Sequence, residues 1–382
     1  MDFLISGITS ITPQQIVMYV IGAVLIWLAI NKDLEPVLLL PLGFGAILVN
    51  LPASGVLNQT LAGIGETNGI IEWLFNVGIE ASEAMPLLLF IGIGAMIDFG
   101  PLLSNPKLFL FGAAAQFGIF AAIVVACFLG FDLKDAASIG IIGAADGPTS
   151  ILVSQVLGSN YIGPIAVVAY SYMALVPIIQ PMVIKLLTTK KERCIHMEYK
   201  PATVSKKAKI IFPIVVTFIA GLVAPMSVSL VGFLMFGNLL RECGVLGNLS
   251  DTAQTSLANL ITLLLGITIS FSMRADAFVR FDTLLIMIIG LLAFVFDTIG
   301  GVLFAKVVNV FLKMAGKPPV NPMIGGCGIS AFPMSARVVQ KMAMKEDPGN
   351  ILIMQATGVN VSGQIASVIA GGLVISLVSA YL

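Results

Sequence analysis

Residues 141–150 read IIGAADGPTS and residues 321–333 read NPMIGGCGISAFP, and both stretches interrupt apolar sequence with glycine, proline and small polar residues. In a helix interior, glycine costs about 1 kcal/mol and proline about 3 kcal/mol relative to alanine. A continuous spanning helix would not carry these residues at such density. We therefore predict two helices that are broken within a bilayer, and we name these stretches the first break (141–150) and the second break (321–333).

The composition of the 382-residue chain is that of a polytopic membrane protein. Hydrophobic residues make up 58% and charged residues 10% of it, against roughly 45–50% and about 25% in soluble domains. Apolar runs of spanning length recur along nearly the whole sequence, and the polar stretches between them are too short to fold separately. We predict a single all-α integral membrane domain, residues 1–382. Its twelve candidate spans are Ile16–Ile30, Pro36–Leu51, Met85–Phe99, Leu108–Leu129, Ala136–Leu157, Gly163–Leu187, Ile210–Ala224, Val228–Leu240, Leu257–Met273, Leu284–Leu312, Met323–Val339 and Ile351–Leu382.

Positive charge gathers around one connection in the middle of the chain. Eight of the twenty cationic residues lie there: Lys185, Lys190, Lys191, Arg193, Lys200, Lys206, Lys207 and Lys209. The positive-inside rule places the basic loop, residues 189–207, in the cytoplasm, so we expect a multi-pass protein of the inner (cell) membrane. A nucleic-acid surface is not expected, because among these charges Tyr199 is the single aromatic residue. The loop divides the spans evenly into halves 1–188 and 208–382.

The two halves carry weak internal similarity, which is typical of transporter folds. Residues 89–99 (LFIGIGAMIDF) resemble 264–271 (LLGITISF), and residues 36–50 resemble 225–240 in their Leu/Gly-Phe pattern. Each half then reaches its break in the same order. We predict two related halves arranged as inverted repeats, built from Gly/Pro-broken helices or re-entrant hairpins, while six full spans in each half would instead make parallel repeats. The segment Ile70–Glu80 carries aromatic residues among acids and is expected to lie at the membrane interface.

The breaks have the chemistry of an alkali-cation site. Unwound backbone at membrane depth is tolerated where it lines a cavity, and its carbonyl oxygens suit a hard cation. Asp146 adds a negative charge to the first break, and there is no Cys/His set for a transition metal. The alternative is that Asp146 caps a helix at an aqueous loop, since Asp-Gly-Pro-Thr is also a turn sequence. Neutral oxygens of the kind that Na⁺ accepts are supplied by Thr149, Ser150, Asn321, Ser330, Asn360 and Ser362.

Two further ionisable residues lie within apolar sequence. Asp297, in Phe294–Gly300, is either an ion-path residue or a buried, hydrogen-bonded structural acid. Arg337 follows the second break by about one and a half helical turns, so it either extends to the cytoplasmic interface or holds a carboxylate in bidentate fashion.

Four runs together resemble one family. They are GIIGAADGPTSI (140–151), AYSYMALVPIIQP (169–181), NPMIGGCGISAFPMSARVV (321–339) and GVNVSGQIASVIAGG (358–372). They are similar to the beta subunits of biotin-dependent, sodium-translocating decarboxylases, which act on oxaloacetate, methylmalonyl-CoA, glutaconyl-CoA or malonate. The resemblance runs from about Pro36 to the C-terminus.

The resemblance implies an activity and assigns roles to residues. It implies that carboxybiotin, supplied on a separate carrier, is decarboxylated while Na⁺ is exported and a proton is consumed. By motif, it assigns Na⁺ binding to Asp146, Asn360, Asn321 and Ser330, catalysis to Tyr172, Arg337 and Asp146, and carboxybiotin binding to Arg337, Ser330 and Gly325. Tyr172 matches a tyrosine near the proton path.

The resemblance also implies partners: a carboxyltransferase (alpha) subunit, a biotin carrier protein, a small membrane subunit of gamma/delta type, and a homo-oligomer within the complex. The competing function is a Na⁺-coupled carboxylate transporter without enzymatic activity. The same broken-helix architecture serves both functions, so the fold alone does not separate them. Neighbouring genes for a carboxyltransferase and a biotin carrier would favour the pump.

Overall fold

Long apolar helices dominate the computed structural model, which describes residues 7, 9–32, 36–61, 63, 65–81, 83–198 and 204–381. In that part of the chain five helical stretches are long and apolar enough to cross a membrane, and two bent pairs bring the number to seven. Tyr199 and Lys200 of the basic loop, and Leu382 at the end of the last predicted span, lie outside the described residues.

The first half begins with two helices, α2 (Pro13–Lys32) and α3 (Pro36–Val49), and then a short antiparallel hairpin of β1 (Asn58–Leu61) and β2 (Gly65–Asn68). This polar hairpin is the exception to the predicted all-α fold. The half continues with α4 (Ile70–Phe75), η1 (Asn76–Glu80), α5 (Ala84–Met96), α6 (Gly100–Ser104), η2 (Pro106–Leu108), α7 (Phe109–Ala115), α8 (Phe117–Phe128), α9 (Leu133–Gly140), η3 (Ile141–Ala144), α10 (Gly147–Val156), α11 (Ile162–Leu187) and α12 (Lys190–Arg193).

The second half follows the basic loop. Its elements are α13 (Lys206–Val223), η4 (Pro225–Ser227), α14 (Val228–Glu242), α15 (Gly247–Thr252), η5 (Ala253–Leu257), α16 (Ala258–Ile269), η6 (Ser270–Met273), α17 (Ala275–Phe278), α18 (Phe281–Met314), η7 (Pro322–Gly328), α19 (Met334–Glu346) and α20 (Ile353–Ser379). Phe218 of α13 is 68% exposed amid other exposed apolar side chains, as expected of a helix whose outer face meets lipid.

Several of the twelve predicted spans are shorter or divided. The span predicted over 136–157 separates into α9, η3 and α10, and the one over 323–339 separates into η7 and α19, because both contain a break. The segment Ile70–Glu80, expected at the interface, meets α5 at a 64° bend, and α11 bends by 68° between Met173 and Leu175.

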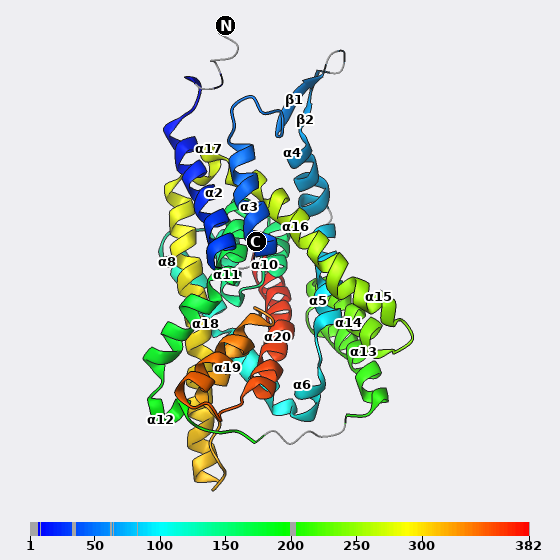
Figure 1. Cartoon of the computed structure of the whole chain (residues 1–382), viewed down its shortest axis with the longest axis vertical. Helices are drawn as coiled ribbons and strands as arrows, with labels where there is room; N and C mark the ends of the chain where they lie inside the picture. Colours follow the sequence, from blue (N-terminus) through cyan, green and yellow to red (C-terminus); the bar gives the residue numbers. More distant parts are fainter. Residues whose placement is uncertain are drawn as a thin grey trace.

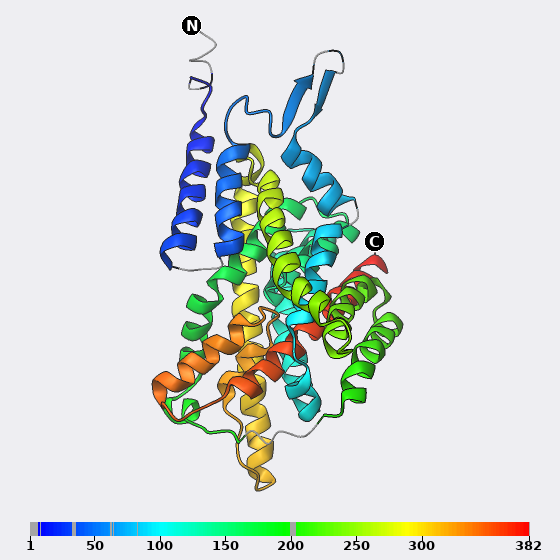
Figure 2. The same cartoon turned by 45° about the vertical axis from the view of Figure 1, so that its right-hand side comes forward.

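From α4 to α20 the two halves present the same order of elements. In each half a π-helical turn (η1 or η5) precedes a long helix (α5 or α16), then come a short helix (α6 or α17), a long span (α7–α8 or α18), a break and a final long helix (α11 or α20). Figure 1 shows α5 descending to α6 while α16 ascends to α17, and α11 descending to α12 while α20 ascends. Figure 2 shows the same opposed directions from another side.

Glycines allow the matched spans α7–α8 and α18 to pack closely in opposite directions. An added Cβ at Gly300 would lie 3.0 Å from the carbonyl oxygen of Ala114, and one at Gly118 would lie 2.5 Å from that of Ala293. The contacts therefore run forward along one helix and backward along the other. This antiparallel pair forms the centre against which both breaks are packed.

Candidate functional site

The two breaks meet each other. The backbone N–H of Ser330 donates to the carbonyl oxygen of Ala144 at 2.8 Å, which joins the second break directly to the first. In the first break Ala145 adopts a left-handed conformation (φ 53°) and ends η3, and Asp146 then turns the chain into α10. Pro148 fits the first turn of that helix, where no N–H partner is needed. The sequence thus ends one helix and starts another within a few residues, deep in the protein.

Asp146 is the centre of this junction, because its side chain is 3% exposed and receives hydrogen bonds from both halves. Its Oδ1 accepts the N–H of Thr149 at 3.4 Å, as expected of an N-cap residue. Its Oδ2 accepts hydroxyl groups of Thr149 at 2.8 Å, Ser330 at 3.2 Å and Ser367 at 3.2 Å. The oxygens of Ser330 and Ser367 also lie 2.8 Å apart. The helix-cap interpretation of Asp146 is therefore correct in geometry, but the cap is buried rather than aqueous.

This junction has the donor set of a small hard cation. One carboxylate and three hydroxyl oxygens converge, and each hydroxyl oxygen keeps lone pairs that can face a cation. Among the described residues, no three His, Cys, Asp or Glu side chains lie together in a way that could hold a metal ion. No lysine or arginine pairs with Asp146 among the ion pairs of the described residues.

The second break is held by amide side chains from three other helices. The Nδ2 of Asn360 on α20 donates to the carbonyl oxygens of Cys327 (3.2 Å) and Ile329 (2.8 Å). The Nε2 of Gln116, between α7 and α8, donates to Gly328 at 3.2 Å, and the Nε2 of Gln180 on α11 donates to Gly326 at 2.7 Å. Four consecutive carbonyls are thereby satisfied. The amide oxygens of all three residues are buried without a hydrogen-bond partner.

The other predicted Na⁺ ligands are divided between this junction and other places. Ser330 is at the junction. Asn360 donates to the carbonyl of Ile329, the residue before Ser330, and its Oδ1 has no hydrogen-bond partner. Asn321 lies at the opposite end of η7, about 14 Å along a seven-residue 3₁₀ segment. There its Nδ2 donates to the carbonyls of Arg193 and Ile195 in the basic loop, both at 2.9 Å. Ser150 and Ser362 donate to backbone carbonyls of Asp146 and Leu108.

Gly325 is a contact between backbones. An added Cβ at Gly325 would lie 2.0 Å from the carbonyl oxygen of Gly301, and one at Gly301 would lie 2.0 Å from that of Gly325. Only glycine at both positions allows η7 to approach α18 so closely. Gly325 thus sets how closely the second break packs on α18.

Two tyrosines of α11 occupy different surroundings. The hydroxyl of Tyr172 donates to the carbonyl oxygen of Met287. Tyr172 also lines a cavity of about 520 Å³, together with residues that include Ser171 and Arg280. The ring of Tyr170 lies against Gly147, where an added Cβ would be 2.4 Å from the ring, and its hydroxyl is buried without a partner. Tyr170, beside Asp146, was not singled out from the sequence, although it precedes Tyr172 by two residues in the same motif.

Arg337 lies on the exposed face of α19, and its side chain forms no ion pair or hydrogen bond with any of the described residues. Near it, a cavity of about 210 Å³ between α11 and α19 is lined by Lys185, Lys341 and Lys345. Arg337, Lys341 and Lys345 recur every four residues, so they share one side of the helix. This side of α19 is therefore cationic, although Glu346 also lines the cavity.

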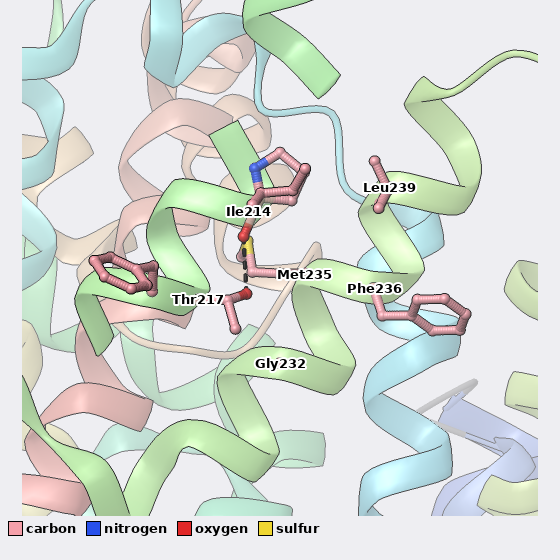
Figure 3. Close-up of a pocket in the computed structure, with 8 residues that line it drawn as sticks. Ile214, Thr217, Gly232, Met235, Phe236 and Leu239 are labelled. Carbon is pink, nitrogen blue, oxygen red and sulfur yellow. Dashed lines mark hydrogen bonds between the residues drawn. The ribbon is translucent and has the colours of Figure 1, made fainter. Parts of the chain in front are cut away.

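A further hollow lies between α13 and α14 (Figure 3). Its volume is about 370 Å³, and its walls include Phe218, Met235 and Phe236. The one hydroxyl that faces it, on Thr217, donates to the carbonyl oxygen of Pro213 at 2.8 Å. A hollow with apolar walls and a satisfied hydroxyl has no group to bind an ion.

Comparison with known proteins agrees with the motifs. Residues 14–378 match the family model described as Na⁺-transporting oxaloacetate decarboxylase beta subunit, so the similarity begins well before Pro36. The methylmalonyl-CoA decarboxylase subunit beta of Propionigenium modestum is 46% identical, over 97% of each chain. The glutaconyl-CoA decarboxylase subunit beta of Acidaminococcus fermentans is 46% identical over 98% of this chain and 96% of its own. The oxaloacetate decarboxylase beta chain of Klebsiella pneumoniae is 41% identical over 98% and 97%. With a family model covering nearly its whole length, the chain belongs to the family of Na⁺-transporting oxaloacetate decarboxylase beta subunits.

Proposed function

We propose that this protein is the membrane subunit of a primary sodium pump, which decarboxylates carboxybiotin and uses the free energy to export Na⁺ while a proton is consumed. The observation that carries the proposal is the buried junction at Asp146, where one carboxylate and three hydroxyls from both halves converge. Membership of a family described as Na⁺-transporting supports Na⁺ as the cation.

The acid that is decarboxylated is selected outside this chain. Relatives named for methylmalonyl-CoA, glutaconyl-CoA and oxaloacetate are all 41–46% identical to it. If the beta subunit itself recognised the acid, relatives named for such different acids would be expected to differ more in sequence. The proposed partners are accordingly a carboxyltransferase (alpha) subunit that binds the acid and a carrier protein that brings carboxybiotin. A small gamma/delta-type subunit and a homo-oligomer complete the proposed complex.

The proposed Na⁺ site consists of Asp146, Ser330 and the oxygen of Asn360, and Thr149 and Ser367 join it through their hydroxyls. Na⁺ at Asp146 neutralises a buried charge, which is costly when it is left unpaired in a membrane. Ser330 contacts Asp146 through its side chain and Ala144 through its backbone. A cation there therefore stabilises the contact between the breaks, which gives Na⁺ a preference for one arrangement of the two halves.

The proposed approach for carboxybiotin is the cationic surface of α19. Arg337 is exposed and has no ionic partner among the described residues, and three lysines and one glutamate are among the residues that line the adjacent cavity. A planar guanidinium binds a carboxylate through two parallel hydrogen bonds. Loss of CO₂ breaks a C–N bond and leaves a basic nitrogen that takes up a proton. Tyr172 is the proposed proton-path residue, and Tyr170, whose hydroxyl has no partner beside Asp146, is a second candidate.

Inverted repeats are the proposed basis of alternating access. Support comes from the shared order of elements, from the opposed directions of α5 and α16 in Figure 1, and from the antiparallel packing of α7–α8 on α18. In such folds one repeat moves against the other around a central site. The basic loop is proposed to face the cytoplasm of a cell whose inner membrane holds the protein, because its charges follow the positive-inside rule.

The decisive experiment replaces Asp146 by asparagine in the full complex reconstituted in proteoliposomes. Asparagine keeps the size and the cap but removes the charge. Na⁺-dependent decarboxylation of carboxybiotin and uptake of ²²Na⁺ should both fall to background. The matched control is Asp282→Asn, because that carboxylate lies at the surface beside Tyr161 and should leave both rates unchanged.

Two outcomes would overturn the proposal. Retention of Na⁺-stimulated turnover by Asp146→Asn would remove Asp146 from the Na⁺ site. Symport of Na⁺ with a carboxylate by the purified chain alone, without partners or decarboxylation, would show that the protein is the transporter of the competing hypothesis.

A further inference from the structure

A second carboxylate, Asp297, is buried in the membrane region away from the cation junction. It lies near the middle of α18, and its side chain is completely buried. It faces the point where α7 ends and α8 begins. An added Cβ at Gly118 would lie 2.3 Å from its Oδ1, so the absence of a side chain there lets the carboxyl group reach the start of α8.

The two oxygens of Asp297 are not equivalent. Oδ1 accepts the backbone N–H of Ile119 at 3.1 Å, in the first turn of α8. The N-terminus of a helix carries about half a positive charge, which favours an oxygen acceptor at this position. Oδ2 is buried and has no hydrogen-bond partner. An unsatisfied polar atom in a protein interior costs about 1–3 kcal/mol, so this oxygen requires an explanation.

Gln116 lies at the same helix start, and its Oε1 is also buried without a hydrogen-bond donor. Its backbone carbonyl accepts the same N–H of Ile119, at 3.2 Å, that Asp297 Oδ1 accepts. Its Nε2 donates to Gly112 at 3.1 Å and to Gly328 in the second break at 3.2 Å. Two buried acceptors without a hydrogen therefore belong to two residues that meet at one N–H group, Asp297 through its side chain and Gln116 through its backbone carbonyl.

The surroundings offer no cation to balance an ionised Asp297. Among the described residues no lysine, arginine or histidine forms an ion pair with it. Four buried titratable groups on the elements around α18 have hydrogen-bond partners elsewhere: Cys327 of η7 with the carbonyl of Ser335, Tyr172 of α11 with Met287, Asp146, next to η3, with its hydroxyls, and Asp135 of α9 with Ser159. The ring of Tyr170 of α11 lies against Gly147, and its hydroxyl has no partner. An uncompensated carboxylate in such a place costs several kcal/mol, and neutralisation is the usual outcome.

We propose that Asp297 is a proton-binding site, in which the hydrogen on Oδ2 is donated to Oε1 of Gln116. One hydrogen atom then satisfies both unpartnered oxygens. It also completes a hydrogen-bonded chain from Asp297 through the amide of Gln116 to the carbonyl of Gly328, two residues before Ser330. Loss of the proton would leave two facing acceptors and loosen Gln116 from the second break. Proton occupancy thus stabilises the arrangement of the second break seen here.

The consequence for turnover rests on the proposed function, but proton binding itself does not. In the proposed pump, Na⁺ at Asp146 and a proton at Asp297 would act on opposite sides of the same short segment, residues 328–330. Binding at one site then changes affinity at the other by the same factor in both directions.

Infrared spectroscopy on the purified chain tests the site without any turnover. In saturating Na⁺ at pH 7, Asp146 is ionised in the proposed Na⁺ complex. Glu83, another buried carboxyl group, is replaced by glutamine in each sample, so a protonated carboxyl band that shifts in D₂O should arise from Asp297. Asp297→Asn should remove this band, and the matched variant Asp146→Asn should retain it. Gln116→Leu should keep the band but move it to higher frequency, because the acceptor of the hydrogen bond is gone.

Several results would overturn the inference. Absence of a protonated-carboxyl band from the unmodified protein would do so whether or not the variants fold. A band that appears only after Na⁺ is removed, and that Asp297→Asn abolishes, would make Asp297 a Na⁺ ligand instead. A band unchanged by Asp297→Asn would belong to another residue, and one unmoved by Gln116→Leu would disprove the pairing with Gln116.

Discussion

The two breaks have similar composition but are stabilised in different ways. The first is largely self-contained: Asp146 caps its own helix, and Ser150 returns a hydrogen bond to the carbonyl of Asp146. The second depends on the rest of the molecule, because amides from α7–α8, α11 and α20 satisfy four of its carbonyls. Its long 3₁₀ segment is of a kind that often marks a hinge.

This difference indicates which break is the more adjustable. A segment whose backbone bonds are local keeps its shape when neighbouring helices move, whereas one whose carbonyls are held by three helices changes when any of them shifts. The first break is therefore suited to hold the carboxylate in place, and the second to transmit movement of α7–α8, α11 and α20 to Ser330. The variants below test whether the first break is the rigid one and the second the adjustable one.

The largest effect is expected from Asn360→Leu. This change leaves the carbonyls of Cys327 and Ile329 buried without partners, at about 1–3 kcal/mol each. The melting temperature of the purified protein should fall strongly, and Na⁺-dependent turnover should be lost. Ser376→Ala is the control, because the hydroxyl of Ser376 bonds only within α20, to Gly372. Equal melting temperatures for the two variants would show that the second break does not depend on α20.

A somewhat smaller effect is expected from Gly325→Ala. The added methyl group would lie 2.0 Å from the carbonyl oxygen of Gly301, so two backbones must separate, at about 1–3 kcal/mol. Gly326→Ala is a matched control one residue away, because its methyl group would meet the flexible end of Ile184 at 3.0 Å. Thermal melting and Na⁺ half-saturation should both change more at Gly325. The reverse order would mean that η7 has room to move on α18.

Sequence reasoning located both breaks and Asp146, because glycine, proline and an acid inside apolar runs contradict a continuous helix. It also associated Ser330 with Asp146, first as a hydroxyl oxygen in the second break and then through the resemblance. It did not find Ser367, which lies seven residues after Asn360 and reaches Oδ2 of Asp146. In the sequence Ser367 is one small polar residue in an apolar helix, and only the packing of α20 against α10 brings its hydroxyl to Asp146.

Two of the three amides that hold the second break were missed for a related reason. Gln116 and Gln180 stand singly in apolar runs, and their partners are backbone carbonyls far away in sequence, which no side-chain pattern can reveal. Asn321 was grouped with Asp146 by motif, whereas the length of η7 carries it to the basic loop. Sequence proximity to a break therefore did not distinguish its two ends.

Ser367→Ala should have a moderate and specific effect at the first break. It removes one of three hydroxyls on Asp146 and leaves the carboxylate in place. One hydrogen bond to a charged group contributes about 1.5–3 kcal/mol, and Na⁺ would lose one oxygen, so the half-saturating Na⁺ concentration should rise roughly tenfold. Ser362→Ala, on the same helix with its hydroxyl on backbone carbonyls, should leave it unchanged. Equal Na⁺ responses from the two variants would place Ser367 outside the site.

The smallest effect is expected from Asp347→Asn at the end of α19. Its carboxylate lies 2.7 Å from Nε2 of His196 in the basic loop, and both side chains are well exposed. The hydrogen bond from His196 holds the pKa of Asp347 below its usual value. A carboxyl group with a lowered pKa in the folded state contributes stability above its unfolded pKa of about 3.9, and loses it as the pH falls through the lower, folded value. At pH 7 the contribution is fully present, but exposed ion pairs stabilise proteins little. The melting temperature at pH 7 should therefore match that of the unmodified protein. The loop is held mainly by two buried side-chain amides, those of Asn321 and Asn350, which donate hydrogen bonds to the backbone carbonyls of Arg193 and Ile195. A fall comparable to that of Asn360→Leu would show instead that this surface pair secures the loop, and with it the end of the second break at Asn321.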